Sequence, residues 1–104
     1  MPECLLVTVA CPPEDAERLA TLCVTQRLAA CVTIQPDVVS VYRWQGALTR
    51  SAESLLLIKT AADRFEPLRE ALLAAHPYEL PEIVAVPVTA AHLPFLDWIV
   101  SETR

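Results

Sequence analysis

The chain has 104 residues, of which 54% are apolar and 20% charged, and its net charge is −5, with 8 basic against 13 acidic side chains. This length predicts one domain over residues 1–104, and the acidic balance without a clustered basic patch excludes nucleic acid and an anionic membrane surface as main partners. The first three residues lack the positive start of a signal peptide, no apolar run reaches the about 18 residues of a membrane span, and the four cysteines lack CxxC spacing. We therefore expect a soluble cytoplasmic protein with reduced thiols and no membrane partner.

The first predicted elements are a strand and a helix. Leu5–Ala10 is apolar and rich in β-branched residues, which is typical of a strand. Pro12-Pro13 ends that strand and opens a helix, because proline is tolerated in a first helical turn and acidic residues follow it directly. We expect this helix to run to about Leu28.

A long hairpin follows, bent at the only glycine of the chain. Residues 31–44 predict a second strand that Pro36-Asp37 interrupts. Gln45-Gly46 begins a turn that we expect to reach to about Ala52, and residues 53–60 return as the third strand. The first arm, at roughly 13 residues, is much longer than the usual strand of about five or six.

The remaining elements are a helix, a strand and a short final helix. Asp63 and Glu66 stand three apart before an apolar run, which is the pattern of a capping box, and Pro77 must end the helix that they start. Residues 83–88 predict the fourth strand, and residues 93–102 the final helix. The order βαββαβ followed by α predicts an α+β, ferredoxin-like fold, in which both crossover helices cover the same face of one sheet.

The predicted strands are apolar on both faces. In the first strand the odd positions 5–9 and the even positions 6–10 are both mostly apolar, and the third and fourth strands behave alike. The order βαββαβ supplies helices for one face of the sheet only. The other face would leave about ten mostly apolar side chains in water. Their exposed area, on the order of 500 Å², is at or beyond the largest apolar patch of a typical monomer. The final helix is too short to cover all of them, so we infer that another subunit does.

Tyr42 and Trp44 lie near the tip of the long hairpin. They are two positions apart and therefore share one face of the strand. We expect the tip to extend past its own domain and to place both aromatic rings against a neighbouring subunit, where such side chains are favoured. The alternative is that both rings belong to the core of their own chain.

The segment from His76 to Glu82 concentrates groups that could carry chemistry. It holds an imidazole, the phenol of Tyr78 and the carboxylates of Glu79 and Glu82 in a short loop stiffened by prolines. A neutral imidazole can bind a transition metal, and carboxylates can add oxygen ligands. The alternative for His76 is a structural role at the end of the second helix, where a cation is favourable.

Cys11 and Lys59 are two further candidates. Cys11 precedes a helix N-terminus, a setting that can lower the pKa of a thiol and make it a ligand or a reactive group; the alternative is core packing, which we expect for the other three cysteines. Lys59 ends an apolar strand; one interpretation is that it pairs with a carboxylate such as Glu79 or Glu82 at the rim of a subunit interface, and the alternative is that it reaches water. No phosphate-binding glycine loop, GxSxG or HExxH motif is present, and we expect no enzymatic activity.

Five spaced motifs run through nearly the whole chain. They are RLAACV (27–32), SVYRWQG (40–46), Glu53 with IKT (58–60), HPYELPEI (76–83) and FLxW (95–98). In these motifs the chain resembles the CutA divalent-cation tolerance proteins. The resemblance implies a ferredoxin-like homotrimer similar to the PII-like proteins, a link to tolerance of copper and other divalent cations, and a position near clefts between subunits for Tyr42, Lys59 and the 76–82 loop.

The chain also departs from its copper-binding relatives. Some of them carry a cysteine where this chain has Thr8 and a second histidine where it has Ala75, so that only His76 of that set remains, with Cys11 three positions from the missing cysteine. The function that we expect is a trimeric cytoplasmic protein that binds a divalent cation, copper first, weakly at inter-subunit clefts. The alternatives are a PII-like signalling or scaffold module for a small anionic metabolite or a protein partner and, third, an enzyme whose site forms between chains.

Overall fold

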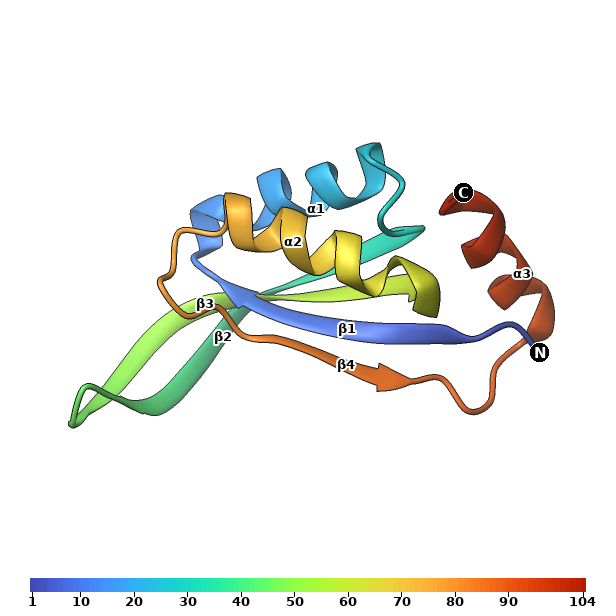
Figure 1. Ribbon diagram of the computed structural model, residues 1–104. Helices are drawn as coiled ribbons and strands as arrows, with labels where there is room; N and C mark the ends of the chain where they lie inside the picture. The colour runs from blue at the N-terminus through green and yellow to red at the C-terminus, as the bar shows by residue number, and fades with distance from the viewer.

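The computed structural model of the chain describes residues 1–104. Its elements are β1 (Cys4–Cys11), α1 (Ala16–Thr25), β2 (Cys31–Trp44), β3 (Ala47–Ala61), α2 (Phe65–Ala75), β4 (Ile83–Pro87) and α3 (Leu93–Glu102). The four strands form one antiparallel sheet in the order β2-β3-β1-β4, and α1 and α2 lie together on one face of it (Figure 1). The predicted α+β, ferredoxin-like arrangement is confirmed.

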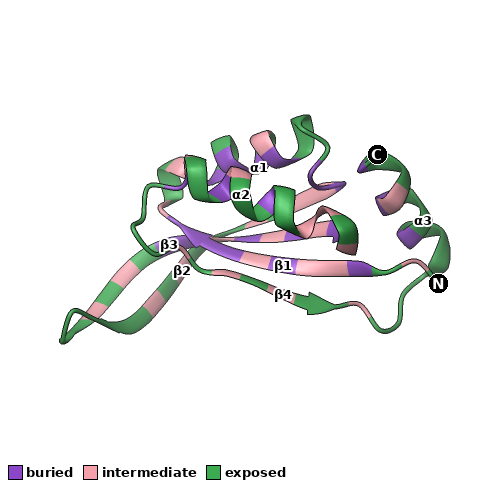
Figure 2. Cartoon of the chain, in the orientation of Figure 1, coloured by how far each residue is buried: buried purple, intermediate pink, exposed green.

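The main core lies between the two crossover helices and the sheet. Alternate strand residues point into it, among them Val7, Val9 and Cys11 of β1 and Leu56 and Ile58 of β3, all fully buried. Buried residues of α1 and α2 pack against them, and Figure 2 shows this buried layer between helices and strands. Burying a large aliphatic side chain contributes about 1.5–3 kcal/mol, so this face of the sheet supplies most of the stability of the single chain.

Both crossover helices differ from prediction at one end. The α1 helix ends at Thr25 rather than Leu28, because Arg27 takes a left-handed conformation (φ 56°) and the amides of the next two residues turn back to the carbonyl of Cys23. The prediction of a capping box at the start of α2 is wrong. No side chain caps this helix, and Asp63 instead receives hydrogen bonds of 2.6 and 2.9 Å from the guanidinium of Arg104.

The turn of the long hairpin is also shorter than predicted. It consists of Gln45 and Gly46 alone, both with positive φ (49° and 82°), which is typical of a two-residue type I′ turn. Strand pairing therefore resumes at Ala47 and not after Ala52, with a bulge between Gln35 and Val38. The hairpin projects beyond the body of the sheet (Figure 1) and makes the molecule 44 Å long against 25 and 22 Å across.

The second face of the sheet has no helix over it. The α3 helix lies beyond one end of the sheet (Figure 1), where its Leu96 and Ile99 pack against Cys4 and Ala30. Further along, Val84 and Val86 of the edge strand β4 are 52% and 49% exposed. We call this side the open face; it includes Leu6, Thr8, Leu55, Leu57, Lys59, Val84 and Val86.

None of the helices is both long and apolar enough to span a membrane.

Candidate functional site

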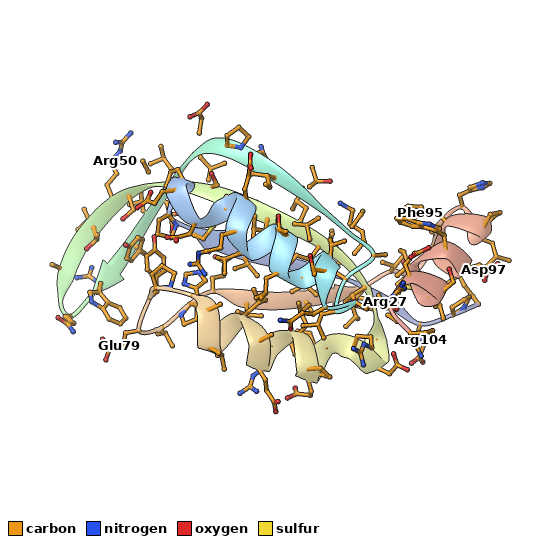
Figure 3. All side chains as sticks on the ribbon, turned by 90° about the horizontal axis from the view of Figure 1, so that it is seen from above. Arg27, Arg50, Glu79, Phe95, Asp97 and Arg104 are labelled. Atoms are coloured by element: carbon orange, nitrogen blue, oxygen red, sulfur yellow. The ribbon has the colours of Figure 1, made fainter.

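A cavity of about 710 Å³ lies between the hairpin and the 76–82 loop. It is hereafter called the hairpin pocket. Residues 40–44 of β2 line one side of it, including Tyr42 and Trp44, and the loop contributes Tyr78, Glu79 and Glu82. The structure thus brings together five of the six residues that sequence reasoning assigned to a cleft. The side chain of Glu79 is labelled at this end of the molecule in Figure 3.

The pocket also contains Glu53, to which sequence reasoning gave no role in the cleft. Glu53 precedes the apolar half of β3 and pairs with Val38 of β2. It is only 4% exposed. The hydroxyl of Tyr78 donates a hydrogen bond of 2.8 Å to its Oε2 atom. Burial first, and this bond to the carboxylate second, raise the pKa of Tyr78, so the phenol keeps its proton. In the sequence, the one feature that could have indicated this role of Glu53 is its place as a single acidic residue at the start of an otherwise apolar strand.

His76 anchors the loop rather than facing the pocket. It is 7% exposed, and its Nδ1 atom accepts a hydrogen bond of 3.1 Å from the backbone N–H of Tyr78. A backbone N–H can only donate a hydrogen bond, so Nδ1 carries no proton. The proton of the neutral ring is therefore on Nε2, which donates to the carbonyl of Ala10 at 2.9 Å. Both ring nitrogens are therefore occupied, and His76 could bind a metal only by giving up one of these bonds.

Cys11 is fully buried in the main core. Burial, with a smaller contribution from the nearby acidic residues Asp15, Glu53 and Glu14, raises the pKa of its thiol to about 11. Of the two alternatives for Cys11, core packing fits the structure, because removal of the thiolate from water outweighs the neighbouring helix end. No three His, Cys, Asp or Glu side chains gather closely enough to hold a metal ion, and the residues around His76 and Cys11 do not fit a resident metal.

Lys59 lies on the open face, away from the hairpin pocket. Its Nζ atom donates to the hydroxyl of Thr33 at 2.7 Å and to the carbonyl of Leu57 at 3.0 Å. Within one chain Lys59 does not reach Glu79 or Glu82, so the predicted pairing at the rim of a subunit interface stays a prediction. Lys59 pairs across the sheet with Leu6, whereas the 76–82 loop meets β1 at Ala10.

The hairpin pocket is acidic. Three of its residues are glutamates (Glu53, Glu79 and Glu82), and one, Arg43, is basic. None of the four ion pairs of the chain involves these residues. An arrangement of unpaired carboxylates beside aromatic rings attracts cations and repels small anions.

The sequence pattern of the CutA1 divalent ion tolerance proteins matches residues 4–102. The chain belongs to this CutA1 family. It is 45% identical to the divalent-cation tolerance protein CutA of Thermus thermophilus, over 99% of each chain. The CutA1 family resemblance drawn from the five motifs is therefore confirmed.

Solved structures of CutA1 proteins have the same fold. The divalent cation tolerance protein from Thermus thermophilus superposes with a TM-score of 0.94 at 42% identity, covering 97% of this chain and 99% of that one. The PII-like protein CutA from Nostoc superposes with a TM-score of 0.88 at 36% identity, covering 100% and 98%. The chain spans about half the length of the plant and human CutA proteins that it also matches.

Proposed function

We propose that this CutA1 chain serves divalent-cation tolerance as a self-associating, non-enzymatic cytoplasmic protein that binds cations weakly, copper first. In this proposal the cation binds at the mouth of the hairpin pocket, where copies of the chain meet. Membership of a divalent ion tolerance family supports the general role. The observation that carries the proposal is the acidic hairpin pocket itself, with Glu79 and Glu82 on its rim and no ion pair to either.

The open face supports self-association. Two helices cover one side of the sheet, and α3 reaches only the end of the other. The exposed Val84 and Val86 belong to an apolar surface that a monomer would leave in water. We propose a homotrimer, in which a second copy covers this face and places its own groups near the hairpin pocket of the first.

The donor atoms of the pocket bear on which cation binds. Glu79 and Glu82 offer two carboxylates per chain, which is too few for a tight site, so further ligands must come from water or from another copy. For any set of oxygen and nitrogen donors, Cu²⁺ binds more tightly than Mn²⁺ or Zn²⁺. Weak binding with a preference for copper is therefore expected.

Calorimetric titration with Cu²⁺, Zn²⁺ and Mn²⁺ tests this proposal. We expect Cu²⁺ to bind most tightly, and the double variant Glu79→Gln/Glu82→Gln to weaken it by about tenfold or more, since both rim charges are lost. The matched control is Glu17→Gln/Glu70→Gln, which removes two exposed charges from the helices, away from the pocket. Equal affinity in both double variants would place the cation elsewhere. A His76→Ala variant that alone abolished binding would assign the site to His76.

The alternative of a module for a small anionic metabolite is not favoured at this pocket. Three carboxylates against one guanidinium repel an anion unless a second copy reverses the charge.

A further inference from the structure

The hairpin has a second exposed face, opposite Tyr42 and Trp44. Successive residues of a strand point to opposite faces, so these two aromatic residues share one side of the hairpin, and Val39, Val41 and Leu48 share the other. The latter three side chains are all half or more exposed. The crossover helices cover the body of the sheet and not this projecting part (Figure 1), so the chain itself leaves the second side bare. We call it the outer face of the hairpin.

The outer face is basic as well as apolar. Arg43 and Arg50 belong to it, because they pair across the hairpin with Leu48 and Val41. Neither arginine takes part in an ion pair. Positions 38–52 hold no Asp or Glu, so the two arginines make this segment positive in a chain whose net charge is −5. An apolar strip with two unpaired guanidinium groups fits an apolar partner surface of negative charge.

The α3 helix offers such a surface at the other end of the molecule. Phe95 and Trp98 stack on it with their ring centroids 5.7 Å apart, and they are 40% and 41% exposed. Asp97 lies between them in the sequence, is exposed and forms no ion pair, and α3 contains no Lys or Arg. Figure 3 labels Phe95 and Asp97 at this end of the molecule and Arg50 at the opposite one. Aromatic rings beside an unpaired carboxylate match an apolar strip that carries arginines.

We propose that the outer face of the hairpin packs on the aromatic side of α3 in another copy of the chain, where its two arginines face Asp97. The two surfaces lie at opposite ends of a molecule 44 Å long, so one chain cannot join its own pair. A second copy is favoured over an unrelated partner, because the chain supplies both halves of the contact in equal number. Such a head-to-tail contact between two different surfaces can close into a ring of copies. The inference rests on the self-association in the proposed function, and it adds which surfaces meet.

Cross-linking between introduced cysteines tests the contact directly. Leu48→Cys and Trp98→Cys are placed in separate, differently tagged chains, and both chains carry Cys31→Ser, because the other three native cysteines are buried. After co-expression, we expect a short bismaleimide to join the two kinds of chain and to give no product with either variant alone. Leu73→Cys on α2, used in place of Trp98→Cys, is the matched control and should give no product. A product from Leu48→Cys alone would show that hairpin meets hairpin and would overturn the inference.

Charge reversal provides a second measurement that leaves the apolar residues in place. Arg43→Glu/Arg50→Glu should raise the Kd of self-association by about tenfold or more, since both guanidinium groups then repel Asp97. Adding Asp97→Arg should recover part of this loss, because it restores opposite charges across the contact. Arg69→Glu, a charge reversal on the exposed side of α2, is the control and should leave the Kd unchanged. Sedimentation over a dilution series measures each Kd.

The outcomes separate this inference from the proposed function. An oligomer that gives no mixed cross-link, or one that Arg43→Glu/Arg50→Glu does not weaken, rejects the hairpin-to-α3 contact and leaves self-association through the open face standing. Weakening without recovery by Asp97→Arg rejects α3 as the partner surface. An unaltered chain that sediments as one copy of 11.5 kDa rejects self-association itself, and this inference with it.

Discussion

At the scale of single residues, three hydrogen bonds fix the 76–82 loop: one to the end of β1, one within the loop and one to β3. His76 donates to the carbonyl of Ala10 and accepts from the amide of Tyr78, and the hydroxyl of Tyr78 reaches Glu53. The rings of His76 and Tyr78 also pack together, with their centroids 4.8 Å apart. Because these polar groups are largely buried, each depends on its partner, and the loss of one should be felt by the whole loop.

Tyr78→Phe tests this dependence. The change removes one hydroxyl, keeps the ring and leaves Glu53 buried without its only hydrogen bond. We expect the free energy of unfolding to fall by about 1–3 kcal/mol, the usual cost of an unsatisfied buried acceptor. Urea denaturation at fixed protein concentration measures it. Tyr42→Phe is the matched control, because its bond to Ser51 is exposed and should matter much less. Equal losses in both variants would show that burial of Glu53 is not the cause.

At the scale of elements, the hairpin depends on a two-residue turn. The 14-residue β2 and the 15-residue β3 pair along nearly their whole length, because Gln45 and Gly46 reverse the chain within two positions. Both have positive φ, which matches the right-handed twist of the strands that they join. The Asp37 bulge, also at positive φ (59°), shifts the register between the sheet body and the projecting part.

Substitutions at this turn should act through the backbone alone. A Cβ atom at Gly46 would meet no atom within 4 Å, but φ there is +82°. Gly46→Ala should therefore destabilise the chain by about 1 kcal/mol from conformational strain without any clash. Gln45→Asn creates the preferred Asn-Gly pair and should stabilise the chain by roughly a few tenths of a kcal/mol. Thermal unfolding of both variants checks these opposite signs, and a loss of stability in both would contradict the type I′ turn.

At the scale of the whole molecule, the apolar surface is divided unequally. The helices cover one face of the sheet, while the open face keeps Val84 and Val86 about half exposed and the hairpin carries Tyr42 and Trp44 beyond the sheet. An exposed apolar surface of this kind typically marks an interface. The hairpin pocket lies next to it, so self-association and ligand binding should be linked.

Val84→Lys tests the role of the open face in self-association. A lysine at this position is solvated in the single chain but would be buried without a partner in an oligomer. We expect the mass measured by light scattering to fall toward that of one chain of 11.5 kDa. Leu73→Lys on α2 is a control with similar exposure on the opposite side of the sheet, and it should leave the mass unchanged. An unaltered oligomer in Val84→Lys would exclude this face as the interface.

The sequence by itself determined the elements, their order and the family. Apolar periodicity and the positions of prolines are local features of the sequence. They located the strands within a few positions and predicted both the two-faced sheet and the aromatic hairpin. Only the tertiary structure decided the start of β3 at Ala47, the bond from Arg104 to Asp63 and the burial of Glu53 beneath Tyr78. The last two of these join residues far apart in the chain. Residues 47–52 show no apolar alternation and become a strand because β2 lies beside them, which no local pattern reveals.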